Sequence, residues 1–288
     1  MSKVQSGGRI FRILNYSFFT LMGIIMIYPF WYVVMLSISD ATRPALNNYY
    51  IIPNGFSLDA FNEVLALPII VKSYINTIFI TVVGTVYKVV LTVMTAYPLS
   101  RQKLRGKKII FNMFLITMVF SGGLIPTYLL IRSLGLVDSM LVFIIPFAVD
   151  VYLLMITLKF FKGISQSLIE SAKIDGYNDV SILFKVVLPL SPAVIAAISL
   201  FYAVGHWNNY TTGLIYINTQ SKQVLQVILQ SLLVSTEQIP RIPRPDVNVS
   251  TQGLRMATIV VSILPILFVY PFVQKYFITG MTLGSVKE

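Results

Sequence analysis

Residues 159–192 read KFFKGISQSLIESAKIDGYNDVSILFKVVLPLSP, a polar stretch between two strongly apolar parts of the chain. The composition of residues 165–173 is compatible with a helix, and its apolar residues follow helical spacing: Leu168, Ile169 and Ala172. Asp175 and Gly176 then predict a turn, because glycine accepts positive φ and closes helices. The stretch therefore begins with a short amphipathic helix that ends in a tight turn.

A second helix is expected after this turn. Asn178 or Asp179 can cap its first turn, and its apolar face comprises Ile182, Leu183 and Val186. Pro189 and Pro192 end it, since proline lacks the backbone N–H that a helix interior needs. The stretch thus predicts a projecting helix–turn–helix with an apolar face. Because water does not satisfy such a face, we expect it to need a partner.

The chain as a whole is too apolar for a soluble enzyme. Of its 288 residues, 56% are hydrophobic and 11% are charged, whereas soluble domains carry roughly 25% charged residues. Disordered chains are poor in apolar residues, so disorder is excluded as well. The absence of cysteine and the single histidine, His206, argue against disulfides, cysteine nucleophiles and multi-histidine metal sites.

Six segments are long and apolar enough to cross a membrane, for which a helix needs about 20 mostly apolar residues. They are residues 13–39, 73–100, 109–131, 139–158, a part of 186–216, and 256–274. The first is too long for the apolar region of a signal peptide, about 7–15 residues, so we expect a retained anchor. The third contains Gly122, Gly123 and Pro126, which favour close helix packing, a bend that moves, or both. The sequence predicts an all-α integral membrane protein with six transmembrane helices.

Basic residues indicate the orientation of these spans. If the N-terminus lies in the cytoplasm, the inner segments hold 14 Lys and Arg residues and the outer segments hold 7. Positive residues accumulate on the cytoplasmic side, so both termini are expected there. The net charge of +11 is then explained by loops that face anionic lipid, and no nucleic-acid partner is expected. The predicted parts are a cytoplasmic N-terminus (1–12), a membrane domain (13–277) with a cytoplasmic loop (159–190) and an extracytoplasmic loop (220–255), and a cytoplasmic tail (278–288).

The cytoplasmic loop carries a motif with fixed spacing. Glu170-Ser171-Ala172 is followed after three residues by Gly176 and, after nine more, by Val186-Val187-Leu188-Pro189. This pattern resembles the Glu-Ala-Ala loop of permease subunits in binding-protein-dependent ABC importers, with Ser171 in place of the first alanine. Residues 120–128 (FSGGLIPTY) and 270–277 (YPFVQKYF) resemble the carbohydrate branch of that family. Within this branch the chain is most similar to permeases for oligosaccharides from alginate- or pectin-type polysaccharides.

The resemblance implies an ABC importer type I permease fold in a bacterial cytoplasmic membrane, with the loop as a coupling helix that docks on an ATPase. It implies two ATPase subunits that bind ATP and Mg, a second related permease, and an extracytoplasmic solute-binding protein. No cofactor and no catalytic residue are expected in this chain. The residues expected to couple to the ATPase are Glu170, Ser171, Ala172, Asp175, Gly176, Leu188 and Pro189. Without the motif, an amphipathic hairpin lying on the membrane surface is the alternative.

The chain has no nucleotide-binding loop of its own. A P-loop needs Gly, four residues, and then Gly-Lys-Ser/Thr. Here Gly106-Lys107 is followed by Lys108, and Arg101 stands where the first glycine is required. The basic residues between 101 and 108 are better explained as an anchor on the positive inner side.

Three ionisable residues lie inside predicted spans, where such residues are costly and mark pathways by default. They are Lys88, Asp150 and His206. Lys88, near the middle of its span, has two interpretations of equal weight. Either it contacts a sugar or its carboxylate in the lumen, or it pairs with Asp150 and holds two helices together.

Residues 205–210 read GHWNNY, a combination suited to sugars, which present apolar C–H faces and polar rims. Asn208 and Asn209 are candidate pathway residues, whereas Trp207 and Tyr210 fit better in the aromatic belt of the membrane surface. Further pathway candidates are Tyr128 and Asn76.

The long outer loop contains Arg241 and Arg244, which are expected to dock the binding protein, with an ordinary solvated loop as the alternative. The predicted function is the permease subunit of an ATP-driven oligosaccharide importer that works by alternating access. A basic lumen would attract uronates, although inner loops account for most of the charge. The rivals are a proton-coupled secondary transporter with Asp150 and His206 as relay, a membrane scaffold, and an ABC permease for a non-sugar solute.

Overall fold

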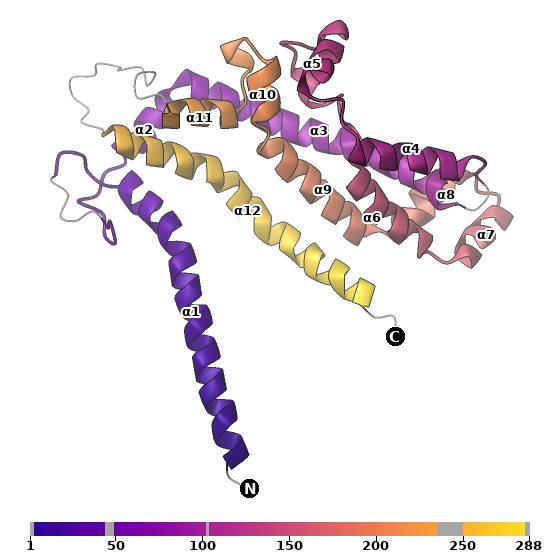
Figure 1. Ribbon diagram of the computed structural model, residues 1–288, viewed down its shortest axis with the longest axis horizontal. Coiled ribbons are helices and arrows are strands. Elements are labelled where there is room, and N and C mark those ends of the chain that lie inside the picture. Colours follow the sequence, from indigo (N-terminus) through magenta and orange to yellow (C-terminus); the bar gives the residue numbers. More distant parts are fainter. Residues whose placement is uncertain (1–2, 44–48, 102–103, 235–249, 286–288) are drawn as a thin grey trace. The chain divides into compact units, whose positions relative to one another are not determined.

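The computed structural model describes residues 3–43, 49–101, 104–234 and 250–285, and within these ranges every regular element is a helix (Figure 1). This confirms the all-α class. The residues form two compact units, which are described separately. The first unit takes residues 1–68 and 231–264, and the second takes residues 69–230 and 265–288.

The first unit begins with the 35-residue helix α1 (Lys3–Ser37). Most described side chains of α1 are exposed, as expected for a helix that faces lipid or another membrane subunit. The segment that follows α1 folds back on it, where the Trp31 indole donates a hydrogen bond to the Ile51 carbonyl (2.9 Å). Helix α2 (Asp59–Ala66) buries Ala60 and Val64. Helix α12 (Thr251–Ser285) begins in this unit.

The second unit is built on α3 (Pro68–Ser100), whose 33 residues extend for about 50 Å. The elements that follow are listed in chain order: α4 (Lys107–Val119), α5 (Leu124–Ser133), the 3₁₀ turn η1 (Met140–Phe143), α6 (Val151–Lys162), α7 (Gln166–Ile174), α8 (Asp179–Ile182), the π-helical turn η2 (Leu183–Val187), α9 (Pro192–Trp207), α10 (Thr211–Tyr216), the 3₁₀ turn η3 (Gln220–Lys222) and α11 (Leu225–Val234). A buried apolar cluster joins the second half of α3 to α6, α7, η2 and α9, with Leu154, Phe161 and Ile198 fully buried.

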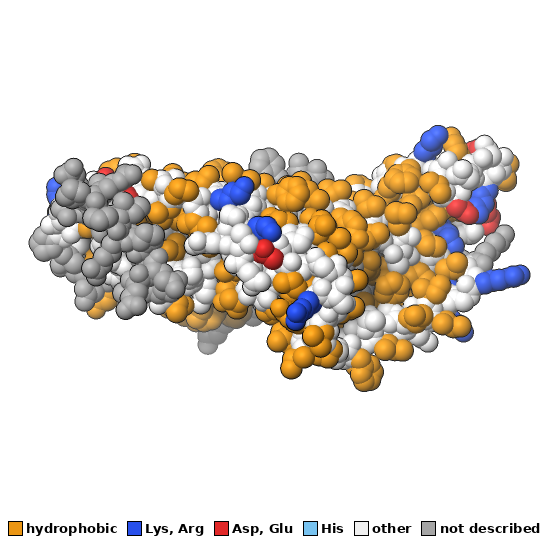
Figure 2. Space-filling view, turned by 90° about the horizontal axis from the view of Figure 1, so that it is seen from above, with side chains coloured by type: hydrophobic (Ala, Val, Ile, Leu, Met, Phe, Trp, Pro, Cys, Tyr) orange, Lys and Arg blue, Asp and Glu red, His pale blue; other side chains and the backbone are white. Residues whose placement is uncertain are grey.

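Three helical stretches are long and apolar enough to cross a membrane: Phe11–Ser37, Pro68–Ser100 and Thr251–Phe268. Two further spans arise if each bent pair of helices is counted as one. These pairs are Lys107–Val119 with Leu124–Ser133, bent by 118°, and Asp179–Val187 with Pro192–Trp207, bent by 92°. The chain is therefore a multi-pass membrane protein, and the count of six spans stays a prediction. Much of the face shown in Figure 2 is hydrophobic, as a protein surrounded by lipid requires.

The predicted third span is interrupted where its glycines lie. Helix α4 ends at Val119, and α5 begins at Leu124 after Gly123, whose φ of +81° is a conformation that favours glycine. No atom lies within 4 Å of a β-carbon built on Gly123. Backbone conformation, and not close packing, therefore explains the glycine at this position.

The continuous helix predicted over residues 139–158 is wrong. The structure forms the short turn η1, then irregular backbone, and begins α6 at Val151. Asp150 is the N-cap of α6, and its carboxylate accepts a hydrogen bond from the Leu153 amide (3.0 Å). Asp150 therefore lies at a helix end, where a carboxylate satisfies free backbone N–H groups.

Candidate functional site: the helical hairpin and the polar residues of the spans

The predicted helix–turn–helix is present as α7, a turn, and α8 continued by η2. Gly176 has a φ of +85°, and the Tyr177 amide donates to the Ala172 carbonyl (3.0 Å), which closes α7. The Asn178 side chain accepts a hydrogen bond from the Ser181 amide (2.8 Å) and thus caps α8. The local signals at Gly176 and Asn178 are confirmed.

The inner face of this hairpin packs on the chain itself. Ile169, Ile182 and Val187 are almost fully buried and belong to the cluster that contains residues of α3, α6 and α9. The expectation that this apolar face needs a partner subunit is therefore wrong. Leu168, which helical spacing assigned to the same face, is 48% exposed. The hairpin is consequently anchored in the body of the second unit.

The hairpin also has exposed apolar side chains on its outer side, and among these the sequence interpretation singled out Leu168 alone, which it assigned to the apolar face. The exposed side chains are Leu168, Ile174, Tyr177, Val180 and Phe184; Ile174 is 86% exposed, whereas Val180 and Phe184 also line a cavity beside the end of α3. An exposed apolar patch of this kind marks an interaction site.

The seven residues of the motif divide between the two faces. Those that are exposed are Glu170, Ser171, Asp175, Gly176 and Pro189, whereas Leu188 is half-buried and Ala172 is buried in the core. The Gln166 amide donates to the Glu170 carboxylate (3.2 Å), and the salt bridge of the hairpin joins Lys173 to Asp179 (2.9 Å). Among the described residues, no salt bridge involves Glu170 or Asp175. Their carboxylates are thus accessible to a basic partner.

The polar residues inside the spans meet around Tyr202 of α9. Its hydroxyl is hydrogen-bonded to the Thr92 hydroxyl (2.7 Å) and accepts a bond from the Asp150 amide (3.1 Å). The Lys88 ammonium lies 5.8 Å from the centre of the Tyr202 ring, within reach of a cation–π interaction. Lys88 makes no salt bridge with Asp150, so the direct pair considered above is not formed.

Sequence interpretation missed Tyr202 and Thr92. A signal was available, because Thr92 follows Lys88 by four positions and Tyr202 precedes His206 by four, which places each pair on one helix face.

His206 and Trp207 are buried between α9 and α3. His206 is 3% exposed and contacts Gly84, and the Trp207 ring packs edge-on against Tyr74 with centroids 5.8 Å apart. Trp207 is thus covered by side chains of its own chain, and its place in the aromatic belt of the membrane surface stays a prediction. Neither side chain is accessible to a sugar in this conformation.

The remaining pathway candidates do not form one site. Asn76 donates to the carbonyls of Ser221 (2.9 Å) and Gln223 (3.0 Å) and fixes the loop before α11 to α3. Tyr128 is stacked on Tyr216, with centroids 5.8 Å apart. The Asn209 side chain accepts a bond from the Thr212 amide at the start of α10 (3.2 Å), whereas Asn208 is exposed at the end of α9.

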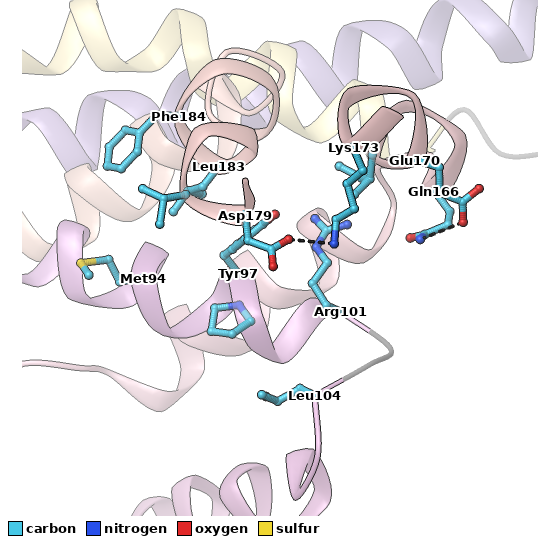
Figure 3. Close-up of a pocket in the computed structure, with 13 residues that line it drawn as sticks. Met94, Tyr97, Arg101, Leu104, Gln166, Glu170, Lys173, Asp179, Leu183 and Phe184 are labelled. Atoms are coloured by element: carbon cyan, nitrogen blue, oxygen red, sulfur yellow. Dashed lines mark hydrogen bonds and ion pairs between the residues drawn. The ribbon is translucent and has the colours of Figure 1, made fainter. Parts of the chain in front are cut away.

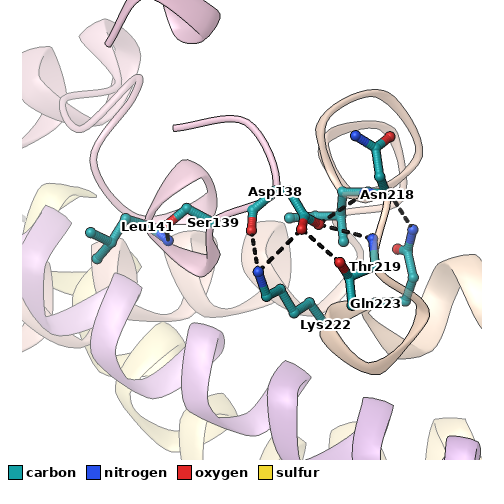
Figure 4. A network of polar contacts seen from close by, with 8 residues as sticks. Asp138, Ser139, Leu141, Asn218, Thr219, Lys222 and Gln223 are labelled. Atoms are coloured by element: carbon teal, nitrogen blue, oxygen red, sulfur yellow. Dashed lines mark hydrogen bonds and ion pairs between the residues drawn. The ribbon is translucent and has the colours of Figure 1, made fainter. Parts of the chain in front are cut away.

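A polar network that the sequence did not reveal is centred on Asp138 (Figure 4). Its carboxylate accepts bonds from the amides of Asn218 (3.1 Å) and Thr219 (2.9 Å) and from the Thr219 hydroxyl (2.6 Å), and it pairs with the Lys222 ammonium (3.2 Å). These donors, the Thr219 hydroxyl foremost, hold the pKa of the Asp138 carboxyl well below its usual range. The network ties the loop before η1 to the loop after α10.

The predicted docking residues Arg241 and Arg244 lie outside the described residues. Their role stays a prediction.

The chain thus combines broken apolar helices with a hairpin whose inner face is buried against α3, α6 and α9. No family model matches the chain. It is 42% identical to the polygalacturonan/rhamnogalacturonan transport system permease protein YtcP of Bacillus subtilis (strain 168), over 97% of this chain and 99% of that protein. It is 40% identical to protein LplC of the same organism, over 97% and 96% of the two chains.

A solved structure agrees with these relatives. The crystal structure of a bacterial ABC transporter involved in the import of the acidic polysaccharide alginate contains a chain that matches with a TM-score of 0.90 and 33% identity. The match covers 94% of this chain and 98% of the other. The protein belongs to the family of permease subunits of carbohydrate ABC importers. Coupling to an ATPase follows from that membership, and the resemblance carried by residues 170–189 is confirmed.

Proposed function

We propose that this chain is one of two different permease subunits of an importer for uronate-containing oligosaccharides. The YtcP relative is named for polygalacturonan and rhamnogalacturonan transport, and the matched structure belongs to an alginate importer. Both names refer to the transport of acidic polysaccharides. Lys88 lies within a predicted span and makes no salt bridge with a described residue, so it supplies a charge that a carboxylated sugar can use.

The proposed assembly has two ATPase subunits, which bind ATP and Mg, a second related permease, and an extracytoplasmic solute-binding protein. This chain then catalyses no reaction. It lies in a bacterial cytoplasmic membrane with both termini in the cytoplasm, as the distribution of Lys and Arg favours. Arg241 and Arg244 are proposed to dock the binding protein from the outside.

The observation that carries the coupling role is the two-faced hairpin of α7, α8 and η2. Its inner face shares a core with α3, α6 and α9, so a displacement of the hairpin is transmitted to the spans. Its outer face presents exposed apolar side chains, and the carboxylates of Glu170 and Asp175 are available to basic residues of an ATPase. Gly176 fixes the turn, while Leu188 and Pro189 end the hairpin near α9.

Among the candidate pathway residues, Lys88 and Asn208 retain a direct role in this proposal. Asn208 is exposed at the end of α9. The contributions of Asp150, His206, Asn209, Tyr128 and Asn76 are positional, because each of them packs against or bonds to the chain itself.

The test begins with purification of the chain from its native membrane in mild detergent and identification of the proteins that accompany it. We expect a second permease and an ATPase. The recovered complex is then reconstituted with its binding protein, and ATP hydrolysis is measured with oligogalacturonate, alginate oligosaccharide or a neutral arabino-oligosaccharide. Stimulation by the acidic sugars alone supports the proposal, and stimulation by the neutral sugar alone contradicts it.

The proton-coupled alternative makes the opposite prediction. Uptake would survive deletion of the ATPase gene and collapse with a protonophore. Uptake lost with the ATPase and retained with the protonophore excludes this alternative.

A further inference from the structure

A cavity of about 560 Å³ lies between the end of α3 and the hairpin, and its two ends differ in chemistry (Figure 3). One end is lined by apolar side chains, among them Met94, Leu183 and Phe184. The other end is lined by Arg101, Lys173 and Glu170. The cavity is thus amphipathic, a property that the coupling role does not require.

Arg101 is the unusual residue at the charged end. Its guanidinium lies over the Tyr97 ring, 4.7 Å from the centroid, and its Nε and Nη2 atoms are buried with no hydrogen-bond partner among the described residues. Arginine stays charged in proteins. Arg101 is half-buried, and burial of guanidinium N–H groups without an acceptor is costly, so the site favours an anion.

Two carboxylates line this end of the cavity, but neither forms a hydrogen bond or salt bridge with Arg101. Asp179 interacts electrostatically with Arg101 but is paired with Lys173 at 2.9 Å, and Glu170 accepts a bond from Gln166. More positive charge lies nearby, because the Lys107 ammonium donates to the Arg101 carbonyl (3.1 Å). The charge at this end therefore attracts an anion from outside the chain.

The lining of the cavity changes from charged to apolar along α3, in the direction expected for a helix that enters the membrane. Met94 precedes Arg101 by seven residues, which corresponds to roughly 10 Å along α3. Helix α3 is longer than the hydrocarbon core of a bilayer, about 30 Å, so a residue just beyond its end, such as Arg101, is able to reach the headgroup region. Met94 and Phe184 are each more than half exposed, and both lie at the apolar end of the cavity.

We propose that the cavity binds an anionic membrane phospholipid, with its phosphate on Arg101 and an acyl chain along Met94 and Phe184. Basic pockets beside membrane helices are suited to such headgroups. The bound lipid contacts both α3 and the hairpin, so it bridges a span to the element that receives the ATPase. The lipid belongs to the cytoplasmic leaflet in the orientation proposed above, and the binding itself does not depend on which sugar is transported.

The experiment measures lipid binding to the purified, delipidated permease complex by native mass spectrometry. The probes are dioleoyl-phosphatidylglycerol, dioleoyl-phosphatidylcholine and inorganic phosphate. We expect phosphatidylglycerol adducts that exceed phosphatidylcholine adducts several-fold and resist competition by inorganic phosphate. The Arg101→Gln variant should lose this excess, whereas Arg105→Gln, which removes the same charge from an exposed position of the same loop, should keep it.

A second variant tests the apolar end without a change of charge. Met94→Trp fills part of the cavity and should lower phosphatidylglycerol binding several-fold.

Equal binding of the two lipids, or equal binding by Arg101→Gln and Arg105→Gln, overturns the proposal. So does competition by inorganic phosphate, which would indicate a free-anion site. Loss of the ATPase from Arg101→Gln complexes with unchanged lipid adducts would instead assign Arg101 to the ATPase contact. If oligosaccharides do not stimulate ATP hydrolysis but lipid binding is normal, the result contradicts the proposed substrate and leaves the lipid site intact.

Discussion

Gly84 of α3 lies against the imidazole of His206 of α9, so closely that a β-carbon at position 84 would lie 2.5 Å from Nε2. His206 is 3% exposed, and the contact lies within the second unit. Small residues allow membrane helices to approach each other in this way. The glycine is therefore required by the neighbouring ring and not by its own backbone conformation.

We expect Gly84→Ala to destabilise the protein by about 1–3 kcal/mol, the usual cost of overpacking. The measurement is the thermal unfolding of the detergent-solubilised complex. Gly205→Ala in α9 is the control, because no atom lies within 4 Å of its added β-carbon. If His206 is the obstacle, the double variant Gly84→Ala/His206→Ala recovers part of the loss. Equal destabilisation by the two alanine variants would contradict the role of this contact.

The Asp138 network predicts a specific dependence on pH. The pKa of its carboxyl is held below its ordinary 3.8, foremost by the Thr219 hydroxyl. The charged carboxylate therefore stabilises the fold above that pH, and this contribution is lost as the pH falls through the lower folded-state pKa. We expect Asp138→Asn to unfold at a lower temperature than the wild type at neutral pH. The difference should narrow below a pH of about 4.

Thr219→Val is the matched variant for this test. It removes the hydroxyl donor but keeps the Asp138 carboxylate, so the pKa of that carboxyl rises toward its ordinary value. The protein should therefore lose stability on acidification at a higher pH than the wild type does. An unfolding difference that is the same at neutral and acid pH would show that the carboxylate charge has no part in the stabilisation.

The hairpin shows what sequence alone can predict. Its turn and its cap depend on local chemistry, and Gly176 and Asn178 are where the pattern expects them. The covered face depends on side chains from other helices, such as Phe161 of α6, which helical spacing does not identify. Hence the pattern predicted a hairpin but assigned its buried side to a partner.

The errors in the spans have a related cause. Residues 139–150 are nearly all apolar, and composition does not distinguish buried irregular backbone from helix. Pro146 was the local sign against a continuous helix. The Asp138 network is harder still to foresee, because its donors follow it by about 80 positions in the chain. Such contacts are defined by tertiary packing.

Substitutions of Gly176 can separate the effect of the backbone conformation of the turn from the effect of side-chain volume at this position. Its φ of +85° is unfavourable for other residues by about 1–2 kcal/mol, yet nothing lies within 4 Å of an added β-carbon. We expect Gly176→Val to lower the ATP hydrolysis stimulated by loaded binding protein several-fold, while Gly176→Asn, which tolerates this conformation, retains most of it. Equal losses would show that side-chain volume at the ATPase contact, and not the turn, is limiting.

Substitution of Lys88 tests whether its charge acts on the transported sugar or supports the packing of the helices. Its ammonium lies 5.8 Å from the Tyr202 ring and makes no salt bridge with any residue that the structure describes, so removal of the charge breaks no ion pair among those residues. A charge that attracts uronates should matter for acidic oligosaccharides alone. We therefore expect Lys88→Met to reduce uptake of oligogalacturonate at least several-fold and to leave uptake of a neutral oligosaccharide nearly unchanged.

Uptake by proteoliposomes is the appropriate measurement, with both sugars presented to the same preparation. Lys72→Met is the control, because Lys72 is an exposed cation near the start of α3 and its loss changes the net charge by the same amount. Lys88→Arg should preserve the preference for acidic sugars, since it keeps the charge. Equal losses for acidic and neutral sugars in Lys88→Met would indicate that Lys88 supports the packing around Tyr202, because a defect in packing impairs transport of every substrate alike.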